Sequence, residues 1–431
     1  MLDAHDEMNN ILDTQVHDPM KLLEAIGALN ILEFIEEHES DAIRIFQTVN
    51  DRGRDLSKMD KMKSLVFYFS NKYLEDKYEN VINNRFGEIF ELYDTIKMIG
   101  EEQKINAINS KQFNEDDLLR HHHVCFSEDS YDPTSQHVLE SVKFFLIGLR
   151  KLKDFSAMDA YIERYTKSLL DYVAAFSKLL RKTAYSTDHY KIFSILGLSA
   201  VYYPVIVQLE RKNLLDKILP EKQISILKMV EIIDVRVLKV RDYAGKKDLA
   251  SFAYRLNNFN QDLKEIETSL LWFNSYQISD DRFKDYLSSY DYSKNTGLLR
   301  LIFIDYCERL KKKTFTIEEL KKIMQEDPTI EHILSQSPRF KPKAFGFKND
   351  EDFENEKNLI GNLTILEKKI NSSIQNIDLA EKHKGYSTSR FKMTNLIGTT
   401  LAANGGNFKK ADMHARAQDL IGNFVIRWWA H

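Results

Sequence analysis

The sequence is poor in cysteine, proline and glycine. Only Cys125 and Cys307 occur in 431 residues, and neither lies in a CxxC spacing. This usage excludes a thiolate zinc site and fits a reducing compartment. The 15 glycines and 7 prolines are also few for a loop-rich all-β protein. The composition therefore predicts a mainly helical fold.

The chain also lacks a strong charge imbalance and a long apolar run. Its formal net charge is −4, so any contact with DNA must come from a local basic patch. The most apolar window, residues 192–210, contains Pro204 and falls slightly short of a comfortable membrane span. We expect this window to be a buried core helix. The acidic N-terminus has no signal-peptide pattern, so we expect a cytoplasmic protein without membrane contact.

What the chain does contain, from Ser57 to about residue 325, is a succession of helical patterns. Apolar residues recur at steps of three and four, and the Ser57 side chain is placed to cap the amide of Asp60. Thr316 and Glu319 form a capping box at the start of the last of these helices. Other predicted helices cover residues 141–152, 160–180, 221–240 and 297–310.

Both ends of the chain differ from this helical middle. Strand candidates lie within residues 28–57, around a turn at 50–53. After Pro328 we predict a strand at 329–336, followed by a basic and aromatic loop. A second predicted strand at 362–370 runs into a polar helix.

The two C-terminal strands carry residues suited to phosphodiester hydrolysis. This reaction needs a base for water and a divalent cation for the charge that builds on the phosphate. An HNH site, also called a ββα-metal site, supplies both from two strands and one helix. Here Glu331 and Asn371 would hold the metal, His332 would be the general base, and Asn362 would hold the loop that follows His332.

The spacing of these residues matches versions of the motif that read NLxxLCxxCN. Asn371 follows Asn362 by nine positions, but Glu367 and Ile370 stand where those versions have zinc-binding cysteines. We therefore expect no structural zinc, and apolar packing must hold the hairpin together.

Four stretches together resemble a known nuclease domain. IEHILSQ, LIGNLTILEKKIN, KGYSTSRF and RAQDLIGNFVIRWW are similar to the C-terminal domain of GmrSD-type modification-dependent restriction endonucleases, over roughly residues 300–431. This resemblance implies an HNH-type endonuclease that cuts modified DNA in a bacterial anti-phage system, with Mg²⁺ or Mn²⁺ as the metal. Ser335 departs from the family, which usually has proline there.

A second resemblance lies near the N-terminus. IRIFQTVNDRGRDLSKMDKMKSLVF is similar to the end of the ParB-like nucleotide-binding domain of the same family. The resemblance implies that Asn50 and Arg52 face a nucleotide, although both also fit a simple turn. The family's other NTP-binding motifs are missing, so we expect no autonomous NTPase activity. NTP would need a partner subunit or a longer chain.

These resemblances divide the chain into three parts. Residues 1–75 would be the remnant of the nucleotide-binding domain, 76–314 a helical domain, and 315–431 the HNH-like nuclease domain. The fold class is thus mainly α, with a small α/β remnant at the N-terminus. An alternative function remains open, in which the chain is a non-catalytic helical interaction subunit. The oligomeric state also stays open.

Several basic residues are candidates for DNA contact. Arg339, Lys341 and Lys343 alternate with phenylalanines, which fits phosphate contact with base stacking, but equally a solvated insertion with buried rings. Lys382 would clamp a phosphate or simply be solvated. The run 121–123 is three histidines, which cannot all reach one metal from a helix. We expect this run at a partly exposed helix end or in a loop.

Overall fold

The computed structural model describes Met20 and residues 56–427, apart from 128–133, 244, 260–261, 337–340 and 375–378. The chain divides into two compact units, 1–56 and 57–431, and the description below concerns the second. Asn50, Arg52 and the N-terminal strand candidates lie outside the described residues. The domain boundaries near residues 75 and 314 stay predictions.

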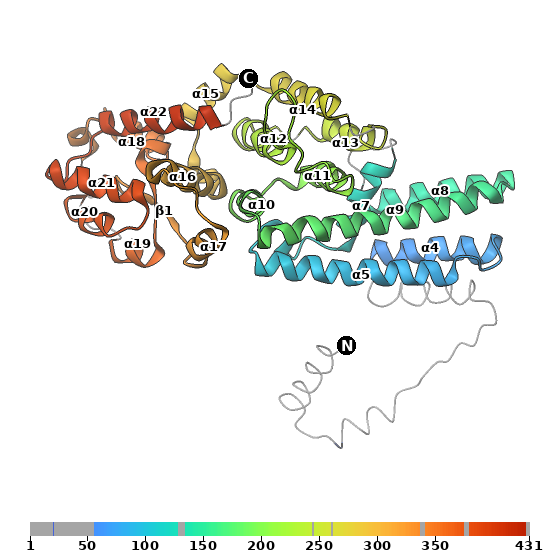
Figure 1. Cartoon of the computed structure of the whole chain (residues 1–431). Helices are drawn as coiled ribbons and strands as arrows, with labels where there is room; N and C mark the ends of the chain where they lie inside the picture. The colour runs from blue at the N-terminus through green and yellow to red at the C-terminus, as the bar shows by residue number, and fades with distance from the viewer. Residues whose placement is uncertain are drawn as a thin grey trace. The chain divides into compact units, whose positions relative to one another are not determined.

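Long helices form the first part of this unit (Figure 1). The first begins after Ser57, whose side chain accepts a hydrogen bond from the amide of Asp60, so the predicted cap is confirmed. The helix α5 packs along α9, and α7 packs against both α8 and α9. These helices are α4 (Lys58–Tyr73), α5 (Glu79–Glu102), α6 (Asn106–Asn109), α7 (Glu115–Phe126), α8 (Ser135–Leu152) and α9 (Phe155–Arg181).

Shorter helical pieces follow, and two predictions fail here. Residues 192–210 are largely buried, as expected, but they do not form one helix. Gly197 has a φ of 69° and ends one piece, and Pro204 stands in the first turn of another. The predicted helix at 221–240 begins only at Ile226, after the capping side chain of Ser225.

The pieces of this part run from residue 182 to residue 289. They are η1 (Lys182–Ala184), α10 (Thr187–Tyr190), the π-helix η2 (Lys191–Leu196), η3 (Ala200–Tyr202), α11 (Tyr203–Arg211), α12 (Ile226–Ile233), the π-helix η4 (Asp234–Val240), α13 (Lys246–Arg255), α14 (Leu263–Gln277) and α15 (Asp280–Ser289).

The C-terminal part holds a two-stranded sheet among helices. The capping box of Thr316 and Glu319 forms as predicted. The elements are η5 (Tyr292–Lys294), α16 (Thr296–Lys311), α17 (Ile317–Gln325), β1 (Thr329–His332), η6 (Pro342–Phe345), α18 (Asp350–Glu356), η7 (Ile360–Asn362), β2 (Leu363–Leu366), α19 (Lys368–Ile374), α20 (Leu379–Ser387), α21 (Lys392–Ala403) and α22 (Lys410–Arg427).

The core of this C-terminal part lies beside the sheet and fixes its place. Leu334, Leu366, Tyr386 and Met413 are among the buried residues of one cluster. Gly361 lies directly against α22, since a Cβ there would come 2.0 Å from the carbonyl oxygen of Met413. The structure is therefore mainly α, with one hairpin held between α-helices. Within the described residues, no helix combines the length and the apolar character that crossing a membrane requires.

Candidate active site

The hairpin of β1 and β2 places the candidate residues. The strands are antiparallel, with Thr329 opposite Leu366 and His332 opposite Leu363. Both strands are shorter than predicted, because β1 turns away after His332 and α19 has already begun at Lys368. Along the chain β1, β2 and α19 come in this order, with η6, α18 and η7 between the two strands.

Asn362 fastens the loop that follows His332. Its side chain is fully buried, and Oδ1 accepts from the amide of Leu334 at 2.8 Å. Its Nδ2 donates to the carbonyls of Leu334 (3.0 Å) and Lys357 (2.8 Å). The backbone oxygen of Asn362 accepts from Ile333 at 2.8 Å. Four hydrogen bonds on one residue fix the backbone beside His332.

His332 is half-buried and has two amide side chains on its ring. Nε2 lies 3.0 Å from Asn358 Oδ1, which assigns the proton to Nε2, because an amide oxygen only accepts. Gln336 Nε2 lies 3.1 Å from both ring nitrogens, and Nδ1 then has the lone pair that accepts. Burial lowers the pKa of His332, against the opposing effects of Asn358 and Glu331. A neutral imidazole with a basic Nδ1 is the form that removes a proton from water.

Two residues of α20 donate hydrogen bonds to the carboxylate of Glu331. Lys382 Nζ donates to Glu331 Oε1 at 2.6 Å and to the carbonyl of His332 at 2.9 Å. The hydroxyl of Tyr386 donates to the same Oε1 at 3.2 Å. The side chains of this pair are 4% exposed for Lys382 and 13% for Glu331, so Lys382 is buried in an ion pair and is not a solvated lysine.

Asn371 lies in α19 and contacts β1 rather than solvent. Its Nδ2 donates to Thr329 Oγ1 at 2.8 Å. Its Oδ1 is buried and has no hydrogen-bond partner among the residues that the structure describes. A buried amide oxygen without a donor is uncommon and suits a cation.

The alternation of β1 separates the candidates into two groups. Thr329 and Glu331 are two apart and share a face of the strand, so Asn371 and Glu331 lie on that face. His332 follows Glu331 directly, and its ring contacts Asn358 and Gln336 instead. The carboxylate and the amide oxygen are thus on one side of β1, and the imidazole is at its end.

Glu367 and Ile370 occupy the positions of the two zinc-binding cysteines of the NLxxLCxxCN motif. They hold the hairpin through hydrogen bonds and apolar packing. Glu367 accepts from the hydroxyl of Ser389 (2.9 Å) and from the amide of Arg390 (2.8 Å). Ile370 packs against the core cluster. The polar contacts of Glu367 were not foreseen in the sequence, where apolar packing alone was expected.

Arg416 adds a second fastening to the hairpin. Its Nη1 donates to the carbonyls of Ile360 (3.1 Å), Gly361 (2.8 Å) and Leu363 (2.8 Å). Burial lowers the pKa of Arg416 to about 10. This cation joins α22 to the start of β2.

The basic loop is partly outside the described residues. Arg339 lies in the gap, whereas Lys341 and Lys343 are exposed and accessible to an anion. Phe347 is buried, with its ring 5.1 Å from that of Phe353. This ring packs in the core and is not exposed for stacking on a base.

The three consecutive histidines are not at an exposed helix end, so that prediction is wrong. They lie inside α7, and all are at most 4% exposed, because α8, α9 and α11 cover this helix. Burial lowers the pKa of His121 to about 3 and that of His122 well below its ordinary value. Over the described part of the chain, no group of three or more His, Cys, Asp or Glu side chains is placed to hold a metal ion.

Three residues near the site were missed in the sequence. Asn358 and Gln336 contact the imidazole, and Tyr386 contacts Glu331. Gln336 follows His332 by four positions inside the stretch IEHILSQ, whereas Asn358 precedes Asn362 by four and lies one residue before the stretch LIGNLTILEKKIN. Tyr386 follows Lys382 by one helical turn, which places both on one face of α20.

Comparison with known protein families gives a match for the C-terminal part of the chain. Residues 277–423 match the model of the C-terminal domain of GmrSD restriction endonucleases. The match contains β1, β2, α19 and α20. No similar protein was found among curated proteins.

Proposed function

Because residues 277–423 carry the C-terminal domain of GmrSD restriction endonucleases, we propose that this chain hydrolyses phosphodiester bonds of DNA in a bacterial restriction system. Modified DNA is the proposed substrate, as the resemblance to modification-dependent enzymes implies. The observation that carries the proposal beyond the family match is His332, a half-buried imidazole whose tautomer is set by Asn358.

In this proposal His332 is the general base of an HNH-type site. Its Nδ1 takes the proton of the attacking water once the exposed Gln336 side chain moves away from that nitrogen. Asn362 keeps the loop after β1 in place, so that the imidazole stays oriented during the reaction. The lowered pKa of His332 keeps the base unprotonated at neutral pH.

Glu331 and Asn371 would hold a divalent cation, Mg²⁺ or Mn²⁺. They fit this role in part, because Asn371 Oδ1 is buried without a hydrogen-bond donor and Glu331 lies on the same face of β1. Such a cation would neutralise charge on the scissile phosphate and the leaving oxygen. One carboxylate with substrate and water ligands is a usual set for Mg²⁺.

Lys382 competes with this role and favours a second candidate function. Its ammonium already neutralises Glu331 at 2.6 Å. In the second candidate the hairpin is vestigial, and the chain is a non-catalytic helical subunit of the restriction system. A partner subunit would then supply the NTP-binding motifs, and Asn50 and Arg52 of this chain would complete the nucleotide site.

Plasmid nicking separates the two functions. Purified chain is incubated with supercoiled plasmid carrying either ordinary or modified bases, with Mg²⁺, with Mn²⁺, or with EDTA. The proposal predicts metal-dependent nicking that is faster on modified plasmid and lost in Glu331→Gln. Absence of nicking by the lone chain, together with co-purification of a second subunit, would favour the non-catalytic role.

Lys341 and Lys343, with Arg339, are proposed to contact the DNA backbone.

A further inference from the structure

A polar cleft in the helical part of the chain has no role in the proposed nuclease site. It has a volume of about 560 Å³, within the usual range for small-molecule sites. Its walls come from α7, α9 and α11 and from the end of α13. The cleft is lined by Cys125, Phe126, Arg164, Lys167, Ser168, Asp171, Arg211, Tyr254, Asn257 and Asn258.

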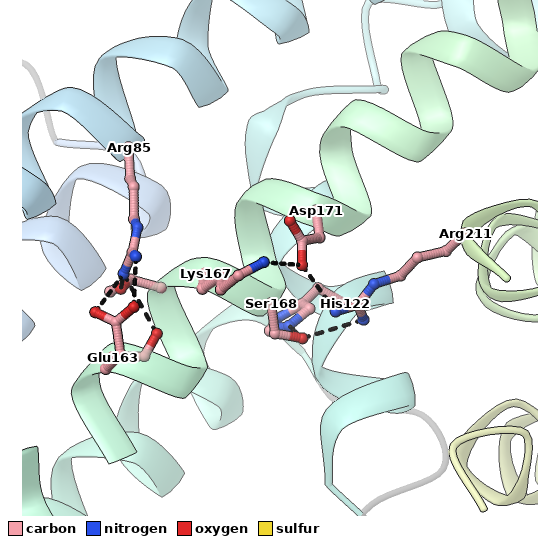
Figure 2. A network of polar contacts seen from close by, with 8 residues as sticks. Arg85, His122, Glu163, Lys167, Ser168, Asp171 and Arg211 are labelled. Atoms are coloured by element: carbon pink, nitrogen blue, oxygen red, sulfur yellow. Dashed lines mark hydrogen bonds and ion pairs between the residues drawn. The ribbon is translucent and has the colours of Figure 1, made fainter. Parts of the chain in front are cut away.

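The cleft carries more positive than negative charge. Asp171 is shared between two cations, with Oδ2 2.9 Å from Lys167 Nζ and 3.3 Å from Arg211 Nη2 (Figure 2). Arg211 Nη1 also donates to Ser168 Oγ at 3.2 Å. Arg164 is a third cation, and Asp171 is the one carboxylate among the lining residues. Such an excess of cations favours an anionic ligand.

Arg164 is held in a way that suits anion binding. Its guanidinium carbon lies 5.3 Å from the ring centre of Phe126. A guanidinium on a ring face keeps its N–H edge for hydrogen bonds. The neighbouring Glu163 is bonded elsewhere, to Arg85 at 2.6 and 2.9 Å, as Figure 2 shows.

Two uncharged residues of the lining, Ser168 and Asn257, are fixed by hydrogen bonds. His122 is buried, and its Nε2 lies 3.1 Å from Ser168 Oγ. Asn257 Nδ2 donates to the carbonyl of Cys125 at 2.6 Å, and Gln208 donates to Asn257 Oδ1 at 2.5 Å. These contacts position Ser168 and Asn257 before any ligand arrives, so binding requires little reorganisation.

The walls also offer flat and amide surfaces beside the cations. Phe126 and Tyr254 are half-buried rings, and Asn258 is an exposed amide at the rim. Aromatic faces with amides beside a cationic cluster are the chemistry that binds a base and its phosphate together. A simple inorganic anion would use only the cations.

We propose that this cleft binds a nucleotide. The phosphate contacts Arg164, Lys167 and Arg211, and the base lies against Tyr254. The nucleotide is either free in solution or a unit of a single DNA strand, since both present the same phosphate and base.

Calorimetric titration of the full chain tests this assignment. The probes are AMP, dCMP, inorganic phosphate and a short single-stranded DNA oligonucleotide. We expect a mononucleotide to bind if the source is free nucleotide, and only the oligonucleotide to bind if the source is DNA. Arg164→Gln should weaken the binding by about tenfold or more, as loss of a charged hydrogen bond does.

Arg181→Gln is the matched control. Arg181 is exposed on the same helix α9, is absent from the lining of the cleft, and its loss changes the charge equally. The Arg181→Gln variant should bind the nucleotide probe with the same affinity as the original chain. If Arg164→Gln lowers the melting temperature, the exposed Lys167→Gln replaces it as the test.

Three results would overturn the assignment. They are no binding of the mononucleotides or the oligonucleotide, equal weakening by Arg164→Gln and Arg181→Gln, and binding of inorganic phosphate as tight as that of the nucleotide probe that binds. The titration requires no DNA cleavage, so its outcome is independent of the nuclease proposal.

Discussion

The histidines of α7 and the histidine at the end of β1 differ in how deeply they are buried and in the hydrogen bonds that their rings make. In α7, His121, His122 and His123 lie in a packed helical interior, and burial keeps the first two neutral. At the end of β1, His332 is half-buried, and amide side chains orient its ring.

The comparison shows that the density of histidines is a poor guide to chemistry. A general base needs a lone pair that water can reach and a partner that fixes the ring. His332 has the partner and partial exposure, whereas the three histidines of α7 are buried between packed helices. The hairpin is held by buried polar side chains on backbone atoms, and α7 is held mainly by packing. The following variants test this difference.

The largest effect on stability should come from Asn362→Ala. The change removes three side-chain hydrogen bonds and leaves buried groups of Leu334 unsatisfied. We expect a loss of about 4 kcal/mol in the free energy of unfolding, measured by urea denaturation. Asn395→Ala is the control, because that more exposed side chain donates one hydrogen bond to Ser387. Equal losses in the two variants would contradict the fastening role of Asn362.

Lys382→Met should have the next largest effect. The change leaves Glu331 buried without its 2.6 Å partner, which costs about 3 kcal/mol of stability. Lys384→Met, two residues along the same helix, removes an exposed ion pair with Glu381 and should change little. If the two variants unfold at the same urea concentration, the buried pair does not hold α20 to β1.

The pH dependence of stability should distinguish the histidines of α7. The pKa values of His121 and His122 are lowered in the native state, so the unfolded chain takes up protons first as the pH falls below about 6.5. Native stability then drops by up to about 1.4 kcal/mol per pH unit for each histidine, and it is fully present above that pH. His122→Gln should flatten this dependence, measured between pH 7 and pH 4. An unchanged slope in His122→Gln would contradict this explanation.

The smallest effect should come from the basic loop. Lys341 and Lys343 are exposed, so replacing both with glutamine should leave the unfolding curve unchanged. If they contact DNA phosphates, binding measured by fluorescence anisotropy should weaken. The slope of log affinity against log salt should then become shallower by about 0.9 for each phosphate that is no longer neutralised. An unchanged salt dependence would remove both lysines from the DNA surface.

Local signals in the sequence predicted local structure well. The caps at Ser57 and at Thr316 were found because a capping side chain and its amide lie within one turn. The order of two strands and a helix was also predictable, although the strand ends were not.

Contacts between residues far apart in the chain could not be predicted from the sequence. The pairing of Lys382 with Glu331 joins residues 51 positions apart, and nothing near Lys382 in the sequence indicates it. The burial of His121–His123 depends on α8, α9 and α11, which cover α7 from other parts of the chain. Residues 192–210 do not form the single helix that was predicted. Gly197 has a left-handed backbone conformation, and it ends the first helical piece of this segment.

The role of His332 as the base is the central claim. The decisive measurement is the single-turnover rate of plasmid nicking with Mg²⁺ for His332→Ala, with the melting temperature of the same sample. We predict a loss of about 100-fold to 10,000-fold in rate at an almost unchanged melting temperature, whereas His383→Ala keeps the original rate. Nicking by His332→Ala at the original rate would contradict this role.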